Sequence, residues 1–233
     1  NGDGYEDVII GAPFYDNGLV DEGMAFVYHG SAAGFAFGTP VTANTRLESD
    51  QIDARFGVSV ASAGRVDADA YADVIVGAHT WDGPLLDGGA AFVFRGSASG
   101  IPDASPLTAH ARITSDQAVT RLGFSVAGAG DVNGDGYADV VVGAFAYDFQ
   151  PGDSDMGAAF VFTGSAAGLA HGTPATAASQ LHPDQAGAQF GRSVASAGDV
   201  DGDGLSDVIV GAMLWDDVAS DEGAVFVYRG RAG

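Results

Sequence analysis

The chain has 233 residues, of which 46% are hydrophobic and 36 are glycine, so it can bury a core and form many tight turns. Its 31 acidic residues outnumber nine basic residues, all of them arginine, and the formal net charge is −22. This charge would repel a phosphate backbone or an anionic membrane surface. We therefore expect neither nucleic acid nor membrane insertion, and cations are the natural partners. The chain contains no cysteine, so disulfide bonds contribute nothing to its stability.

A short segment recurs four times along the chain. The opening NGDGYED at 1–7 runs into VIIGA, and related segments at 65–73, 131–139 and 199–207 each run into a similar apolar stretch ending in Gly-Ala. The closing aspartates of the four copies, Asp7, Asp73, Asp139 and Asp207, are separated by 66, 66 and 68 residues. A period sustained this closely predicts stacked supersecondary units.

Each unit carries the signals of four short strands. In the second unit we expect a first strand at 56–61, a buried second strand at 73–78, an aromatic third strand at 89–94 and a weaker edge strand around 107–114. Four strands per unit of about 66 residues predict an all-β fold, a β-propeller built from four-stranded blades, because a solenoid has shorter coils and a sandwich does not repeat in register. We expect about 3.5 blades: a partial blade at 1–55, blades at 56–121 and 122–189, and a partial blade at 190–233.

Three of the recurring segments have the pattern of a loop that wraps a hard cation. In the two complete copies, 131–139 and 199–207, side-chain oxygens stand at positions one, three, five and nine, and glycines allow the sharp bends between them. The first copy starts at position three and therefore lacks the position-one oxygen. With the backbone carbonyl of position seven, these oxygens suit Ca²⁺, which takes six to eight oxygen ligands. The predicted ligands are Asn1, Asp3, Tyr5 (carbonyl) and Asp7; Asp131, Asn133, Asp135, Tyr137 (carbonyl) and Asp139; and Asp199, Asp201, Asp203, Leu205 (carbonyl) and Asp207. We expect about three structural calcium sites.

Two other structures have similar sequences to these calcium loops. An EF-hand is excluded because Val142 and Val210 stand at the twelfth position, where an EF-hand has a bidentate glutamate. The loops could also be plain strand-linking turns, since Asp, Asn and Gly favour turns without any metal. Matched copies that share a ninth-position aspartate favour the metal interpretation.

The second copy departs from the pattern. It has Arg65 in the first ligand position and Ala68 and Ala70 at both glycine positions, beside Asp67, Asp69 and Asp73. A guanidinium among three carboxylates opposes cation binding and can itself pair with them. We expect this loop to hold no metal, with Arg65 forming an internal salt bridge in its place.

The loops between second and third strands are acidic and aromatic. They offer a possible ligand face for a sugar or peptide, although one aromatic–Asp pair per blade could equally pack against its neighbour. The pairs are Tyr15 and Asp16, Trp81 and Asp82, Tyr147 and Asp148, and Trp215 and Asp216. The recurring Asp50-Gln51, Asp116-Gln117 and Asp184-Gln185 are expected to form a turn or a hydrogen bond between blades.

Signals of catalysis are weak. The five histidines show no pairing at metal or triad spacing, and no serine lies in a nucleophile elbow. A pair of glycosidase-type carboxylates stays open on the sequence alone. The expectation is a protein that is not an enzyme.

The recurring dipeptides resemble the FG-GAP repeats of the N-terminal head of integrin α subunits and of bacterial secreted proteins. The first half is carried by Phe56-Gly57, Leu122-Gly123 and Phe190-Gly191, and the second by Gly11-Ala12-Pro13, Gly77-Ala78, Gly143-Ala144 and Gly211-Ala212. Only the first copy keeps the proline, which His79, Phe145 and Met213 replace elsewhere. The resemblance covers essentially the whole chain.

This resemblance implies a propeller with calcium in the loop that joins the first two strands of a blade. It also implies an extracellular or cell-surface binding or adhesion module, with an extracellular protein or glycan as ligand. The alternatives are a carbohydrate-recognition or accessory propeller of a secreted enzyme, and a purely architectural repeat. Integrin-like heads use seven blades, so we expect the rest of the ring to come from a longer chain or, less favoured, from a second copy.

Overall fold

The computed structural model describes residues 1–35, 38–150 and 154–233, and these residues form four antiparallel sheets. The first sheet contains β1 (Val8–Ala12), β2 (Met24–Tyr28) and β3 (Thr45–Glu48). The second contains β4 (Ser59–Gly64), β5 (Asp73–Ala78), β6 (Ala90–Phe94) and β7 (Ala111–Thr114). The third contains β8 (Ser125–Gly130), β9 (Asp139–Ala144), β10 (Ala158–Phe162) and β11 (Ser179–Leu181). The fourth contains β12 (Phe190–Gly198), β13 (Asp207–Ala212) and β14 (Ala224–Tyr228).

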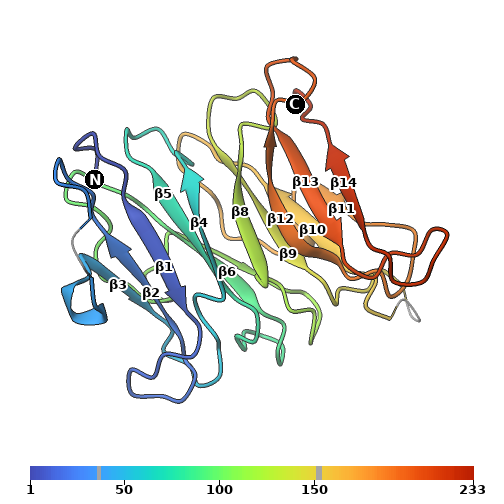
Figure 1. Cartoon of the computed structure of the whole chain (residues 1–233), viewed down its shortest axis with the longest axis horizontal. Coiled ribbons are helices and arrows are strands. Elements are labelled where there is room, and N and C mark those ends of the chain that lie inside the picture. The colour runs from blue at the N-terminus through green and yellow to red at the C-terminus, as the bar shows by residue number, and fades with distance from the viewer. Residues whose placement is uncertain (36–37, 151–153) are drawn as a thin grey trace.

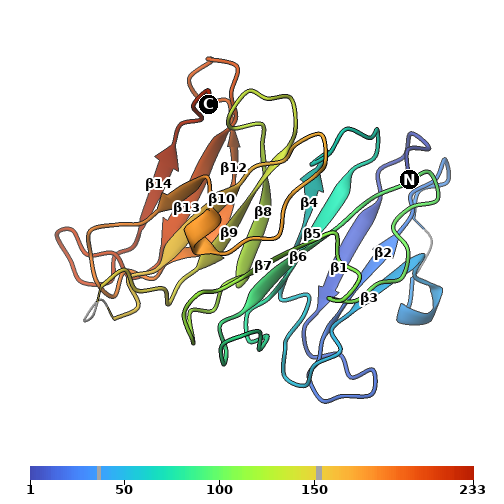
Figure 2. The same cartoon turned by 180° about the vertical axis from the view of Figure 1, so that it is seen from behind.

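The sheets stand side by side in chain order, from the β1–β3 sheet at one end to the β12–β14 sheet at the other (Figure 1). The same order is seen from behind (Figure 2), and the two chain ends lie at opposite ends of the row. Each sheet has the strand order of a propeller blade, and the row is open. The all-β fold predicted from the repeats is confirmed. Its helical content within the described residues is two 3₁₀ turns, η1 (Pro40–Thr42) and η2 (Pro174–Thr176).

Four strand boundaries of the second sheet differ from the sequence-based expectation. Strand β4 ends at Gly64 instead of Ala61, and β6 begins at Ala90 instead of Gly89. In the second sheet β4 begins at Ser59 instead of Phe56, because Gly57 has a φ of +84° and turns the chain before the strand starts. The fourth strand β7 begins at Ala111 instead of Leu107, whose side chain is 83% exposed. Residues 105–108 form a turn in which the Thr108 amide donates to the Ser105 carbonyl at 2.9 Å.

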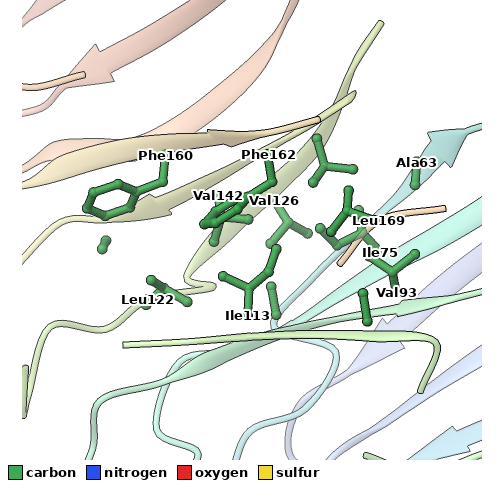
Figure 3. Packing of buried hydrophobic residues seen from close by; sticks show 14 of the residues in the cluster. Ala63, Ile75, Val93, Ile113, Leu122, Val126, Val142, Phe160, Phe162 and Leu169 are labelled. Carbon is green, nitrogen blue, oxygen red and sulfur yellow. The ribbon is translucent and has the colours of Figure 1, made fainter. Parts of the chain in front are cut away.

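The hydrophobic core lies between successive sheets. Strands β5, β6, β9 and β10 are buried along their whole length, as their continuous apolar sequences predict. Figure 3 shows Ile75, Val93 and Ile113 of the second sheet in one cluster with Val142 and Phe160 of the third. Burial of apolar surface between blades is therefore what holds neighbouring units together.

Innermost strands of neighbouring blades are also joined by hydrogen bonds. The Val126 amide of β8 donates to the Ser59 hydroxyl of β4 at 3.0 Å, and the Val194 amide of β12 donates to the Ser125 hydroxyl of β8 at 3.0 Å. The same bond recurs because the serine and the valine hold the same positions in each unit. Within the described ranges, the structure contains no helix with the length and hydropathy needed to cross a membrane.

Candidate metal centres

The four recurring segments all lie at the same end of the blades. Segments 65–73, 131–139 and 199–207 connect the first strand of a sheet to the second, and segment 1–7 leads into β1. In each, side chains at positions three and five accept hydrogen bonds from the amide two residues further on. In the third copy the Asn133 Oδ1 accepts from Asp135 N, and the Asp135 Oδ1 accepts from Tyr137 N, both at 2.9 Å. These turns curl the backbone so that the side-chain oxygens of one segment lie on one side.

The first-position aspartates brace the third and fourth loops. The two carboxylate oxygens of Asp199 accept from Gly202 N at 2.7 Å and from Gly204 N at 2.9 Å. The pKa of Asp199 is lowered, first by the hydrogen bond from Gly204. Asp131 accepts from Gly134 N and Gly136 N at 2.7 and 2.8 Å in the same way. Both loops are thus built around a carboxylate that accepts hydrogen bonds from the loop backbone.

The ninth-position aspartates tie each loop to the turn after the third strand. Asp73, Asp139 and Asp207 are fully buried. Asp139 accepts from Val132 N at 2.8 Å and from Gly164 N at 2.9 Å. Burial raises the pKa of Asp139 to about 6, and the negative charges of Asp135 and Asp131 add to the rise. A cation placed among these groups would relieve that repulsion.

The fourth loop brings three predicted ligands together. Asp199, Asp201 and Asp207 each place one carboxylate oxygen within 4.8 Å of the others. Oxygens that surround Ca²⁺ at about 2.3–2.6 Å have separations of this size, so the donor set fits a hard cation. Asp203 lies outside this group, and its Oδ1 accepts from Leu205 N at 2.9 Å. The carbonyl ligands at Tyr5, Tyr137 and Leu205 stay predictions.

The first loop follows the same plan over the residues it retains. Asn1 Oδ1 accepts from Asp3 N, and Asp3 Oδ1 accepts from Tyr5 N, both at 3.0 Å. Asp7 accepts from Gly30 N at 3.0 Å, as Asp139 does from Gly164.

In the second loop the ion pair involves a different arginine from the one expected. Arg95, which follows β6, places its Nε 2.7 Å from Asp67 Oδ2, and Asp67 is only 4% exposed. Arg65 instead donates from Nε to the backbone carbonyl of Asp69 at 2.9 Å. The predicted internal salt bridge therefore exists, but Arg65 does not form it. Because β6 runs antiparallel to β5, Arg95 directly after β6 lies beside Asp73 at the start of β5. The local sequence does not show that Arg95 is near this loop.

A second arginine near a loop was also missed. Arg229 places Nη1 3.0 Å from Asp201 Oδ2 in the fourth loop. Arg95 and Arg229 share one signal that could have identified them. Each stands immediately before the glycine, Gly96 or Gly230, whose amide donates to the ninth-position aspartate.

The aromatic residues of the possible ligand face lie at the opposite end of the blades from the metal loops. Each packs edge-on against the phenylalanine of the strand that follows it in the chain: β2, β6, β10 or β14. The ring-centroid distances are 5.4 Å for Tyr15–Phe26, 5.4 Å for Trp81–Phe92, 5.1 Å for Tyr147–Phe160 and 5.2 Å for Trp215–Phe226. These rings thus contribute to blade packing, whatever else they contact.

The aspartates beside these rings close their own loops. Asp16 accepts from Asp21 N at 2.7 Å, Asp82 from Asp87 N at 2.6 Å, and Asp216 from Asp221 N at 2.5 Å. Tyr147 donates its hydroxyl to Asp116 Oδ1 at 3.1 Å, and burial raises the pKa of Tyr147 to about 12. The backbone carbonyl of Asp148 accepts a hydrogen bond from Gln117 Nε2.

The glutamines of the Asp-Gln pairs connect one blade to the next. Gln51 follows the last strand of the first sheet and donates Nε2 to the Asp82 carbonyl at 2.9 Å, while its Oε1 accepts from Asp82 N. Gln185 makes the same two bonds to Asp216, at 3.0 and 2.8 Å. Gln117 bonds Asp148 likewise. These contacts confirm the hydrogen-bond role expected for the glutamines.

Comparison with known proteins also finds a repeat of the FG-GAP type in this chain. A family model described as FG-GAP repeat matches residues 1–28, 122–162 and 190–228. The stretch between the first two matches includes the altered loop at 65–73.

Curated relatives include three integrin α chains. Integrin alpha-5 of Xenopus laevis is 33% identical over 153 residues, which cover 64% of this chain and 14% of that protein. Human integrin alpha-IIb is 32% identical over 150 residues, covering 62% of this chain and 14% of that protein. Integrin alpha pat-2 of Caenorhabditis briggsae is 35% identical over 158 residues, covering 62% and 12%. The chain thus spans only about one seventh of the length of these relatives. With the four blade-like sheets, these similarities support an integrin-like FG-GAP repeat domain in this chain.

Proposed function

We propose that the chain is a calcium-stabilised β-propeller module of an extracellular or cell-surface protein that binds an adhesion ligand. The observation that carries the calcium part is the meeting of three carboxylate oxygens from Asp199, Asp201 and Asp207 at the end of the fourth sheet. The integrin α relatives support the adhesion part. The role of the metal is structural, and the chain is not an enzyme.

The residues that hold the loops explain why a cation there would stabilise the fold. Asp207 joins loop 199–207 to the turn after β14 through Gly230 N at 2.8 Å, and to its own loop through Val200 N at 2.8 Å. Bound Ca²⁺ supplies positive charge among carboxylates that otherwise repel one another. We infer sites of this kind in loops 1–7, 131–139 and 199–207. In loop 65–73 the guanidinium of Arg95 takes the place of the ion.

Calcium titration by calorimetry and by thermal unfolding tests this proposal. Calcium should raise the unfolding temperature of the wild-type chain. Asp203→Asn should weaken this effect because it removes one negative charge from a predicted site while keeping the oxygen that accepts from Leu205 N. The matched control is Asp69→Asn, at the same position of the second loop. An unfolding temperature that ignores calcium, or an equal effect of the two variants, would contradict the proposal.

A second candidate function is carbohydrate recognition. It is favoured by a cavity of about 710 Å³ at the ligand-face end of the first sheet, lined by Tyr15 together with Asn17, Arg46, Glu48, Asp50 and Asp103. An aromatic ring beside several polar side chains is the composition of a pocket for a polar ligand.

Glycan-array binding separates the two candidates. If the cavity binds a saccharide, Asp50→Ala should weaken binding because Asp50 is an exposed lining residue. Asp184→Ala changes the equivalent, likewise exposed residue of a later repeat and should leave glycan binding intact. Binding to an extracellular protein ligand without any glycan signal would favour the adhesion function.

A further inference from the structure

One position in each repeat decides whether a positively charged side chain stands next to the metal loop. It is the residue just before the glycine that donates to the ninth-position aspartate, and we call it the pre-turn position. It is occupied by His29, Arg95, Thr163 and Arg229 in the four copies. The two arginines contact the same place in their loops, the carboxylate at loop position three.

Arg95 is fixed in place. Its Nε lies 2.7 Å from Asp67 Oδ2, and Asp67 is 4% exposed. Its Nη2 also donates to the backbone carbonyl of Ala167 in the next repeat. The Arg95 side chain is 37% exposed, but a buried carboxylate and a second contact hold the guanidinium against the loop.

Arg229 makes the corresponding pair but is held far less tightly. Its Nη1 lies 3.0 Å from Asp201 Oδ2, while its side chain is 72% exposed. Asp201 is one of the three residues whose oxygens meet in the fourth loop. An exposed ion pair of this kind contributes little and exchanges readily with solvent.

The third loop has no such competitor. Its pre-turn residue is Thr163, which is uncharged, and its loop position three is Asn133. The side-chain amide of Asn133 donates to Asp135 Oδ2 at 3.0 Å within the loop.

We propose that Arg229 is a displaceable internal competitor for the cation of loop 199–207, so that this loop fills at higher calcium concentration than it would without the arginine. The inference rests on the proposed function, in which these loops bind calcium. An ion that takes Asp201 must break the Arg229 pair and then sit close to a like charge. The pre-turn residue therefore grades the repeats, from a doubly held cation at Arg95 to a displaceable cation at Arg229 to an uncharged residue at Thr163.

A site-resolved calcium titration of the full chain by ¹H–¹⁵N NMR tests the grading. The amides of Gly136 and Gly204 report the third and fourth loops, because each donates to the first-position aspartate of its loop. Arg229→Thr should tighten binding at Gly204 by roughly two- to five-fold, the range for loss of an exposed ion pair. Thr163→Arg should weaken the calcium affinity of the third loop, reported by the Gly136 amide. It should leave the calcium affinity reported by the Gly204 amide unchanged.

The control is Arg231→Thr, which removes one positive charge from the same chain end. Arg231 is in none of the ion pairs recorded among the described residues. If Arg229→Thr changes the Gly204 affinity no more than Arg231→Thr does, the competitor role is overturned while the calcium function stands. If neither glycine responds to calcium up to about 10 mM, well above the range of extracellular modules, the calcium function and this inference both fall.

Discussion

Gly143 and Gly211 occupy the same position in successive repeats but meet different surroundings. A methyl group added at Gly143 would lie 1.9 Å from the Gly191 carbonyl oxygen of the next blade. At Gly211 the nearest atom would be Ser193 Cβ at 3.6 Å, an ordinary contact. The second half of the recurring motif is thus small because the backbone of the following blade crosses it.

Replacing each glycine by alanine tests this contact. Gly143→Ala should lower the free energy of unfolding by about 2 kcal/mol or more, since the backbone of the next blade has to move. Gly211→Ala should change it by less than about 1 kcal/mol. Urea denaturation at fixed calcium concentration measures both. Similar losses for the two variants would argue against close blade contact as the reason for this glycine.

At the residue scale, His79 makes the stability of the folded protein depend on pH. Burial, with the positive charges of Arg121 and Arg55, lowers the pKa of His79 to about 4. An unfolded histidine titrates near 6.5, so the unfolded state binds the proton first, and stability is lost as the pH falls from about 6.5 to about 4.

The variant His79→Phe copies Phe145, the residue at the same position of the next repeat. It keeps a ring beside Phe124, whose centroid lies 5.3 Å from that of His79. Between pH 7 and pH 5 the variant should lose about 1–2 kcal/mol less stability than the wild type. Chemical denaturation at the two pH values gives this difference. Equal losses would mean that His79 is protonated in the folded protein.

At the scale of elements, one glutamine per repeat adds a polar connection between a blade and the next. Gln185 makes two hydrogen bonds to the backbone of Asp216, at 3.0 and 2.8 Å. They fix the β13–β14 loop to the connector that precedes β12.

Gln185→Ala should destabilise the chain by about 1–2 kcal/mol, because each bond contributes about 0.5–1.5 kcal/mol. Amide exchange at Asp216 should accelerate at the same time. As a control, Gln180→Ala removes a bond to the Pro174 carbonyl at the other end of its sheet and should leave the Asp216 amide unaffected. Unchanged exchange at Asp216 in Gln185→Ala would contradict the connecting role.

Much of this element structure is predictable from the sequence. The second and third strands follow from continuous apolar runs such as 73–78 and 89–94, and the loop turns follow from Asp, Asn and Gly. The start of the first strand is not predictable in this way. The Phe56-Gly57 dipeptide has strand-like composition, but Gly57 adopts a positive φ because its backbone packs against the Met24 carbonyl of the preceding blade.

At the scale of the whole molecule, the last sheet of these 233 residues is less protected from solvent than the third sheet. Strand β10 in the third sheet is buried at every residue. Its counterpart β14 in the last sheet has Val225 66% exposed and Val227 49% exposed. The last sheet therefore gains less from apolar burial than the middle sheets do.

Hydrogen exchange followed by mass spectrometry should show this difference. Amides of β9 and β10 should exchange most slowly, and those of β14 markedly faster, because elements with less buried side chains open locally more often. The matching sequences AAFVF in β10 and AVFVY in β14 make the pair a fair comparison. Protection of β14 equal to that of β10 would show that the sheets unfold only together.

The sequence by itself determined the repeat, the strand content and the position of the acidic loops. These depend on patterns within about ten residues: alternating oxygens, turn glycines and apolar runs. Only the tertiary structure decided which partners meet across long separations. Arg95 pairs with Asp67 because the antiparallel strand β6 ends beside the loop that contains Asp67. The backbone of Gly191 lies against Gly143 because the next blade packs there. Such contacts depend on strand pairing and blade packing, which bring together residues that are far apart along the chain.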